Sequence, residues 1–122
     1  MQTQKSKIKI EKFEDILAWQ KAYRLTKEIY QSFKNCRDYS FRDQIQRAVI
    51  SIMNNIAEGY ERKGNKEFKQ FLYIAKGSCG EVRSMLYPAR DFRYINDEEF
   101  ENYKALTIEV ARMLSGLIKS LD

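Results

Sequence analysis

The chain has 122 residues, of which 43% are hydrophobic and 32% are charged, so it is long enough to bury one core and too short for two domains. Lysine and arginine outnumber the acidic residues by 22 to 17. This charge suits either a polyanion as partner or helices of opposite charge packed side by side, and we favour the packed helices. The sequence contains no apolar run of roughly 18 residues and no apolar N-terminal segment, which argues against a membrane span or a secretory signal. We therefore expect a cytoplasmic protein without a membrane partner, with Cys36 and Cys79 as reduced thiols.

Residues 1–12 are polar and carry four lysines, and we expect them to form a basic flexible tail before a single domain at residues 13–122. Apolar residues then recur at steps of three and four, which predicts a first helix over residues 14–34. A second periodic run predicts a helix that begins after Tyr39 or Ser40 and ends near Arg62. The core positions of these two helices are Ala18, Ala22, Leu25, Ile29, Phe33, Phe41, Ile45, Ala48, Val49, Ile52 and Ile56.

A Lys-Gly-Asn turn at residues 63–65 precedes a third helix, which is predicted to run from Asn65, as its N-cap, to about Arg93. Pro88 lies inside it, and because an interior proline loses a backbone hydrogen bond we expect a kink at residues 84–88 or an early end. A fourth helix is predicted to start after Asn96 or Asp97. The core positions here are Phe68, Phe71, Leu72, Ala75, Cys79, Val82, Leu86, Ala89, Phe100, Tyr103, Leu106, Val110, Met113, Leu114, Leu117 and Leu121.

Four helices of about 30 Å each, joined by short connections, pack antiparallel to their sequence neighbours. The sequence therefore predicts an all-α fold, an antiparallel up-down-up-down four-helix bundle. A three-helix bundle is the alternative if the second and third helices are continuous, and the turn at residues 63–65 argues against it.

Residues that could support catalysis are scarce. The chain has no histidine, and its glycines do not form a phosphate-binding loop. Glu58 and Glu81 are the carboxylates that an enzyme could use, but no nucleophile or activated water is placed beside them, and we expect each to make a buried or half-buried hydrogen bond between helices. We therefore expect no catalytic residue, no metal and no cofactor.

Three segments carry a resemblance to a known family. They are WQKAYRLTKEIY at residues 19–30, QIQRAVISIMNNIAEGYER at residues 44–62 and KEFKQFLYIAKGSCGE at residues 66–81. These strings resemble the 23S ribosomal RNA intervening-sequence proteins, and the likeness covers the chain beyond its basic tail. The chain departs from the family pattern at Met53, where proline is frequent, and at Pro88, which interrupts a stretch that is usually an unbroken helix.

The resemblance implies a four-helix bundle that assembles as a ring-like homopentamer, is encoded in or near insertions in large-subunit ribosomal RNA genes, and has no established enzymatic activity. A similar family, the accessory variability determinants of diversity-generating retroelements, shares the fold and the ring and is implicated in binding nucleic acid and a reverse transcriptase. The family motif residues in this chain are Asn55, Glu58, Gly59, Gly77, Ser78 and Glu81.

Two features indicate a surface for contact with further copies. Helical spacing places Gly77 opposite the apolar face of its helix. A glycine inside a helix costs about 1 kcal/mol of stability against alanine, so its presence on an outward face suggests that another backbone approaches closely there. The alternative is a tolerated surface glycine. Ile50, Met53 and Ala57 form a second apolar strip on the preceding helix, which also suits an interface.

Basic residues recur at steps of seven along the third helix, at Lys69, Lys76, Arg83 and Arg90, so they form one stripe. The favoured interpretation is salt bridges to Glu98, Glu101 and Glu109 of the fourth helix. The other is binding of a phosphate backbone, together with tail lysines that we expect to be more exposed. The tail lysines are Lys5, Lys7, Lys9 and Lys12.

These observations lead to a main hypothesis and two others. The first is a non-enzymatic, homo-oligomeric scaffold that binds structured RNA or DNA, with ribosomal RNA as the context that the resemblance implies. The second is an adaptor between proteins whose basic residues are consumed in internal pairs. The third and weakest is an enzyme that uses Glu58 or Glu81.

Overall fold

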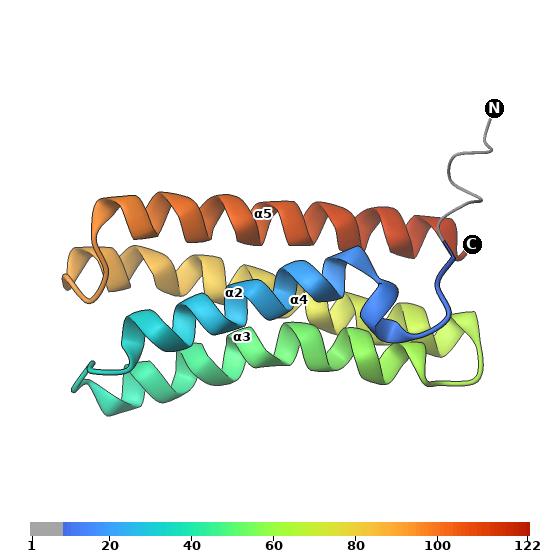
Figure 1. Ribbon diagram of the computed structural model, residues 1–122, viewed down its shortest axis with the longest axis horizontal. Helices are drawn as coiled ribbons and strands as arrows, with labels where there is room; N and C mark the ends of the chain where they lie inside the picture. The colour runs from blue at the N-terminus through green and yellow to red at the C-terminus, as the bar shows by residue number, and fades with distance from the viewer. Residues whose placement is uncertain (1–8) are drawn as a thin grey trace.

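The computed structural model describes residues 9–122 and shows four long α-helices preceded by one turn of 3-10 helix (Figure 1). The short turn is η1 (Phe13–Asp15), and the long helices are α2 (Leu17–Phe33), α3 (Tyr39–Tyr60), α4 (Asn65–Asp91) and α5 (Asp97–Ser120). The predicted all-α fold is therefore confirmed. No helix within residues 9–122 is both long and apolar enough to cross a membrane.

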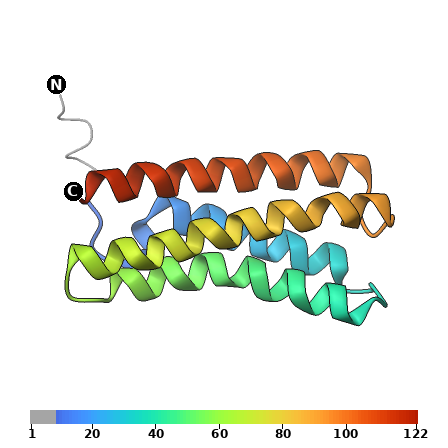
Figure 2. The same ribbon diagram turned by 180° about the vertical axis from the view of Figure 1, so that it is seen from behind.

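The helices alternate in direction and pack in cyclic order, α2 on α3, α3 on α4, α4 on α5 and α5 on α2 (Figures 1 and 2). The C-terminus lies at the same end as the start of α2 and the connection between α3 and α4. This is the predicted up-down-up-down bundle. The three-helix alternative is wrong, because the chain leaves the helix at residues 61–64 before α4 begins.

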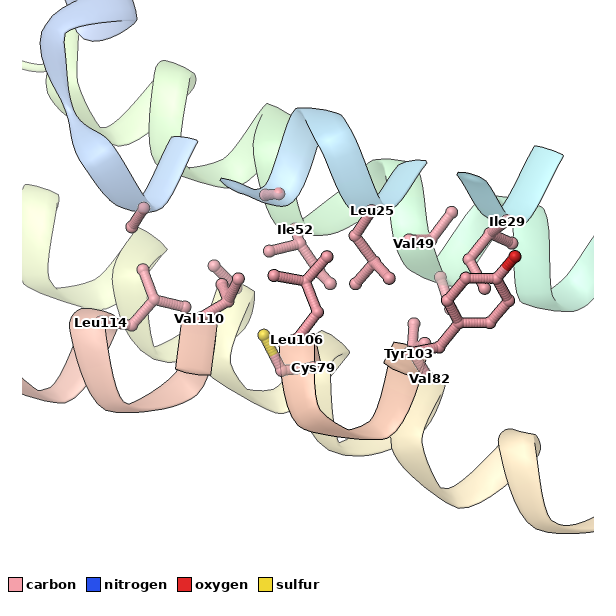
Figure 3. Close-up of a cluster of buried hydrophobic side chains, with 14 of the residues drawn as sticks. Leu25, Ile29, Val49, Ile52, Cys79, Val82, Tyr103, Leu106, Val110 and Leu114 are labelled. Atoms are coloured by element: carbon pink, nitrogen blue, oxygen red, sulfur yellow. The ribbon is translucent and has the colours of Figure 1, made fainter. Parts of the chain in front are cut away.

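The core follows the predicted apolar stripes (Figure 3). Leu25 and Ile29 of α2 lie near Val49 and Ile52 of α3, with side chains of α4 and α5 closing the layer. Phe41, Met113, Leu117 and Leu121 are only partly buried and pack at the margin of this core, and Phe71 is half-buried. The buried residues outside the predicted core are Ile16, Thr26, Gly59, Ile95, Thr107 and Ile118.

The two buried threonines are hydrogen-bonded to their own helices. The Oγ1 of Thr26 donates to the carbonyl of Ala22 at 2.8 Å, and the Oγ1 of Thr107 donates to that of Lys104 at 2.7 Å. Because a buried hydroxyl without a partner is costly, these bonds allow polar residues on the apolar stripes.

The helix starts differ in part from the prediction. Helix α3 is capped by Asp38, whose Oδ1 accepts from the backbone N–H of Phe41 at 3.2 Å. Asn96 caps α5 in a reciprocal box with Glu99, as the acidic first turn indicated. Asn65 is not the N-cap of α4, because the backbone is already helical there and Gly64 takes the cap position.

Pro88 does not end α4 early, and that alternative is wrong. The proline lies in the last turn, so its missing N–H removes a bond only from the end of the helix. Arg93 then adopts a left-handed φ of 67°, and the N–H of Tyr94 donates to the carbonyl of Ala89 at 2.8 Å. This is the C-terminal closure that glycine usually provides, here made with arginine.

Candidate nucleic-acid interface

The basic stripe of α4 lies along the flank that faces α5. Lys76 and Arg83 line a hollow of about 360 Å³ with Ile108, Ala111, Arg112 and Ser115 of α5. Lys76 also lines a neighbouring hollow of about 230 Å³, whose other walls are Tyr73 of α4 and Ser115, Ile118, Lys119 and Asp122. The two hollows share Lys76 and Ser115, so they are adjacent, and we name them together the α4/α5 groove. Figure 2 shows the two helices as neighbours that draw apart toward the end where the C-terminus lies.

Helix α5 contributes basic residues that sequence reasoning missed. Arg112 and Lys119 line the groove and are exposed. Lys104 lies further along α5, with its Nζ 5.7 Å from the ring centre of Tyr87 on α4. Residues 95–122 have a net charge of −3, so the summed charge of this segment gives no sign of a basic face. The spacing of eight and seven residues between these three positions could have revealed it.

The ends of the α4 stripe are paired, although not with the residues expected. Lys69 forms an ion pair with Asp122, and the hydrogen bond between them raises the pKa of Lys69. Arg90 lies 3.2 Å from the Asp91 carboxylate, and its guanidinium is 4.2 Å from the ring centre of Phe100.

The predicted partners of the stripe are wrong. Glu109 pairs instead with Lys21 of α2 at 3.3 Å, on the other flank of α5. Glu98 and Glu101 form no ion pair with the stripe within residues 9–122. The acidic first turn of α5 caps its own helix and leaves the middle of the groove basic.

Four basic side chains therefore remain open to solvent in the middle of the groove. They are Lys76 and Arg83 of α4 and Arg112 and Lys119 of α5. None of the four forms an ion pair with another residue of the described chain. Four unpaired cations from two antiparallel helices make a surface that attracts phosphate groups.

The tail lysines are only partly covered by the structure. Lys5 and Lys7 lie outside the described residues. Lys9 is exposed, and Lys12 is exposed and lies 3.4 Å from the carboxylate of Asp15. The backbone N–H of Glu11 donates to the same carboxylate, which lowers its pKa.

The family motif residues lie mostly along the contact between α3 and α4. The hydroxyls of Ser51 and Ser78 are 3.0 Å apart, and the side-chain amide of Asn55 donates to the carbonyl of Ser51 at 2.8 Å. Gly59 is buried, and a Cβ there would lie 2.6 Å from the Cβ of Phe71. The glycine at 59 therefore lets α3 and α4 pack closely.

Glu58 and Glu81 are exposed, so their expected burial is wrong. Glu58 pairs with Arg62 one turn later at 3.1 Å, within α3. Glu81 accepts from the side-chain amide of Gln44 at 3.4 Å, which does join α4 to α3 as predicted. Within residues 9–122 neither carboxylate accepts a hydrogen bond from a hydroxyl or thiol, although Glu81 lines a hollow that Ser51 and Ser78 also line. The described residues contain no cluster of three or more His, Cys, Asp or Glu that could hold a metal.

The residues expected at a subunit interface lie on two separate surfaces. Gly77 is exposed on α4, and a Cβ added there would meet nothing within 4 Å. Ile50, Met53 and Ala57 are half-buried on α3, and helical spacing puts them on the flank away from Ser51. The fold does not bring Gly77 and this strip together within one chain.

Comparisons with known proteins agree with this architecture. No curated protein matches the chain. A crystal structure from Bacteroides thetaiotaomicron, of a protein of unknown function from the S23 ribosomal protein family, has the same fold, with a TM-score of 0.79 and 23% sequence identity over 84% of this chain and 99% of that one. The model of the 23S rRNA-intervening sequence proteins matches residues 14–116, which covers α2, α3 and α4 and all but the last four residues of α5. The chain therefore belongs to the family of 23S rRNA-intervening sequence proteins.

Proposed function

We propose that this protein is a non-enzymatic scaffold that binds nucleic acid in the α4/α5 groove. The observation that carries the proposal is the set of four exposed, unpaired basic side chains around the groove within the described chain, Lys76, Arg83, Arg112 and Lys119. The family name gives RNA, and ribosomal RNA in particular, as the first partner to test.

The shape of the groove suits a linear polyanion better than a small ligand. On α4 the groove extends from Tyr73 to Arg83, roughly 15 Å at 1.5 Å per residue, and its unpaired cations come from both helices. A strand laid along this surface would place successive phosphates near successive cations and release the counterions that each phosphate holds. Contacts to the phosphate backbone carry no sequence information themselves, so we expect little sequence preference.

We also propose that the chain forms a homo-oligomer, a pentamer by family resemblance. Gly77 and the strip of Ile50, Met53 and Ala57 lie on different surfaces of one chain. An interface that pairs two different surfaces generates a ring when the rotation between copies closes, and an open filament when it does not. The α3 strip of one copy would pack near Gly77 of the next. A ring would repeat the groove once per copy, which strengthens binding to a long strand without new contacts.

Titration of fluorescently labelled RNA against matched charge variants tests the binding. A variant with Lys76, Arg83, Arg112 and Lys119 all changed to Gln removes the groove cations, and we expect binding to weaken by at least tenfold. A variant with Arg24, Lys27, Lys34 and Arg37 all changed to Gln removes the same number of exposed charges from α2 and the connection that follows it, and is the control for net charge. Equal losses in the two variants would contradict a groove site, and no binding by the unaltered protein at low salt would favour the adaptor between proteins.

A further inference from the structure

Two exposed tyrosines and a glycine follow the basic stripe along α4. Tyr73, Gly80 and Tyr87 are spaced by seven residues, as are Lys69, Lys76, Arg83 and Arg90. Because both sets repeat every seven residues on one helix, the tyrosines with Gly80 form one line along α4 and the basic stripe forms another parallel to it. The line of tyrosines lies on the solvent side of the basic stripe, and Tyr73 lines the α4/α5 groove together with Lys76 and Lys119.

The tyrosine rings are available to a ligand. Tyr73 is 59% exposed, and its ring makes no aromatic or cation–π contact within residues 9–122. Tyr87 is 41% exposed and makes a T-shaped contact with Phe100. Arg90 and Lys104 lie 5.6 and 5.7 Å from the centre of its ring, so the Tyr87 ring is less accessible to a ligand than that of Tyr73.

Gly80 leaves the helix surface between the rings of Tyr73 and Tyr87 without a protruding side chain at that position. It is exposed, and a Cβ there would meet nothing within 4 Å, so close packing within the chain does not require a glycine at this position. A mid-helix glycine costs about 1 kcal/mol against alanine. Tyr73 and Tyr87 are about 21 Å apart along the helix, with Gly80 at the midpoint. A strand of several nucleotides could pass from one ring to the other over this open backbone.

We propose that the ligand of the α4/α5 groove is single-stranded nucleic acid, with bases stacked on Tyr73 and Tyr87 while its phosphates contact Lys76, Arg83 and Lys119. This inference rests on the proposed function and narrows its substrate class. A duplex hides the faces of its bases inside the stack, so only an unpaired strand gains from exposed rings beside a basic groove. Base stacking on aromatic residues is tolerant of sequence, in keeping with binding through the phosphate backbone.

The test compares a short oligoadenylate RNA with the same strand annealed to its complement, by fluorescence anisotropy at low salt. We expect the single strand to bind more tightly than the duplex. Tyr73→Leu should weaken binding of the single strand by roughly tenfold and leave duplex binding unchanged, whereas Tyr73→Phe should keep near-normal affinity. Tyr30→Leu on α2, where the tyrosine is 40% exposed, is the matched control and should have no effect.

A change in salt separates stacking from charge. Tyr73→Leu should lower affinity without altering the slope of log affinity against log salt, because it removes no phosphate contact. Duplex binding as tight as single-strand binding, or equal effects of Tyr73→Leu and Tyr30→Leu, would overturn the inference. In that case a loss on removing the four groove cations would still support the proposed function; if neither probe binds the unaltered protein, both proposals fail.

Discussion

The hydroxyl of Tyr94 donates a hydrogen bond of 2.6 Å to the Oδ2 of Asp38, the residue whose other carboxylate oxygen caps α3. Tyr94 lies in the connection between α4 and α5, so this bond ties the start of the second long helix to the turn before the last. The ring of Tyr94 also packs edge-on against Phe41, 5.3 Å between ring centres. One end of the bundle is therefore stabilised by two contacts of Tyr94, the hydrogen bond to Asp38 and the aromatic contact with Phe41.

Tyr94→Phe should lower the melting temperature at neutral pH and reduce its dependence on pH. The Tyr94 hydrogen bond lowers the pKa of Asp38 below its ordinary value, so the stability it provides is present above about pH 4 and is lost as the pH falls through the lowered pKa. The same bond raises the pKa of Tyr94 to about 12, so its stability is present below about pH 10 and is lost as the pH rises toward 12.

Melting curves of both proteins across the pH range check this prediction. The difference in melting temperature should be largest near neutrality and should shrink at both extremes. Asp15 also has a lowered pKa, but it is present in both proteins and cancels in the comparison. A difference that stays constant from acid to alkaline pH would contradict the role of the hydrogen bond.

Gly59→Ala should destabilise the fold by about 1–3 kcal/mol, as expected for overpacking of a tight contact. The new Cβ would lie 2.6 Å from the Cβ of Phe71 and 3.0 Å from a ring carbon of Phe68, so α3 and α4 must separate. Urea denaturation measures the change in the free energy of unfolding. A Gly59→Ala protein as stable as the original would show that the close packing of α3 on α4 is not required.

Gly77→Ala should leave the single chain intact and reduce self-association. Alanine favours a helix by up to about 1 kcal/mol over glycine, and a Cβ at 77 meets nothing in the chain. Gly116→Ala on α5 is the control, because Gly116 is also exposed and unobstructed. Light scattering should show a smaller mass for Gly77→Ala than for Gly116→Ala; equal masses would remove the interface at Gly77.

One of the two thiols should react with a disulfide reagent in the native protein. Cys79 is 2% exposed, and burial raises the pKa of its thiol to about 12, so it is neither accessible nor ionised. Cys36 is partly exposed at the end of α2 and should react. Ellman's reagent should titrate one thiol in buffer and two in denaturant, and two fast-reacting thiols in buffer would indicate that the core opens readily.

The sequence predicted the helices because each has a strong apolar period, from Ala18 to Phe33 in α2 and from Phe68 to Ala89 in α4. It was less accurate at the ends of the helices, where a single hydrogen bond can determine the residue at which a helix begins or ends. Asp38, which caps α3, is a favoured N-cap residue that lies one position before the expected start, and its second bond, from Tyr94 56 residues later, is a contact that no local pattern contains. Similarly, the α4 end depends on Arg93 in a conformation that arginine seldom adopts.

Half of the candidate site was within reach of the sequence. Periodicity on one helix identified Lys76 and Arg83, but it could not show which residues of another helix lie beside them. Arg112 and Lys119 were overlooked because net charge was summed along α5, whereas its acidic residues gather in the first turn and its basic ones on one face. The sum hid the basic face of α5, which the helical spacing of Arg112 and Lys119 carries, and only the packing of α4 on α5 showed that this face lies beside Lys76 and Arg83.

The salt dependence of RNA binding tests the central claim, that the α4/α5 groove binds a phosphate backbone through Lys76, Arg83, Arg112 and Lys119. For the unaltered protein we expect log affinity to fall linearly with log salt concentration, and for a single strand each of these contacts contributes about 0.7 to the slope. The variant that lacks the four groove cations should lose close to 3 from the slope, at about 0.7 for each of the four. An unchanged slope in that variant would contradict the groove as the site of binding.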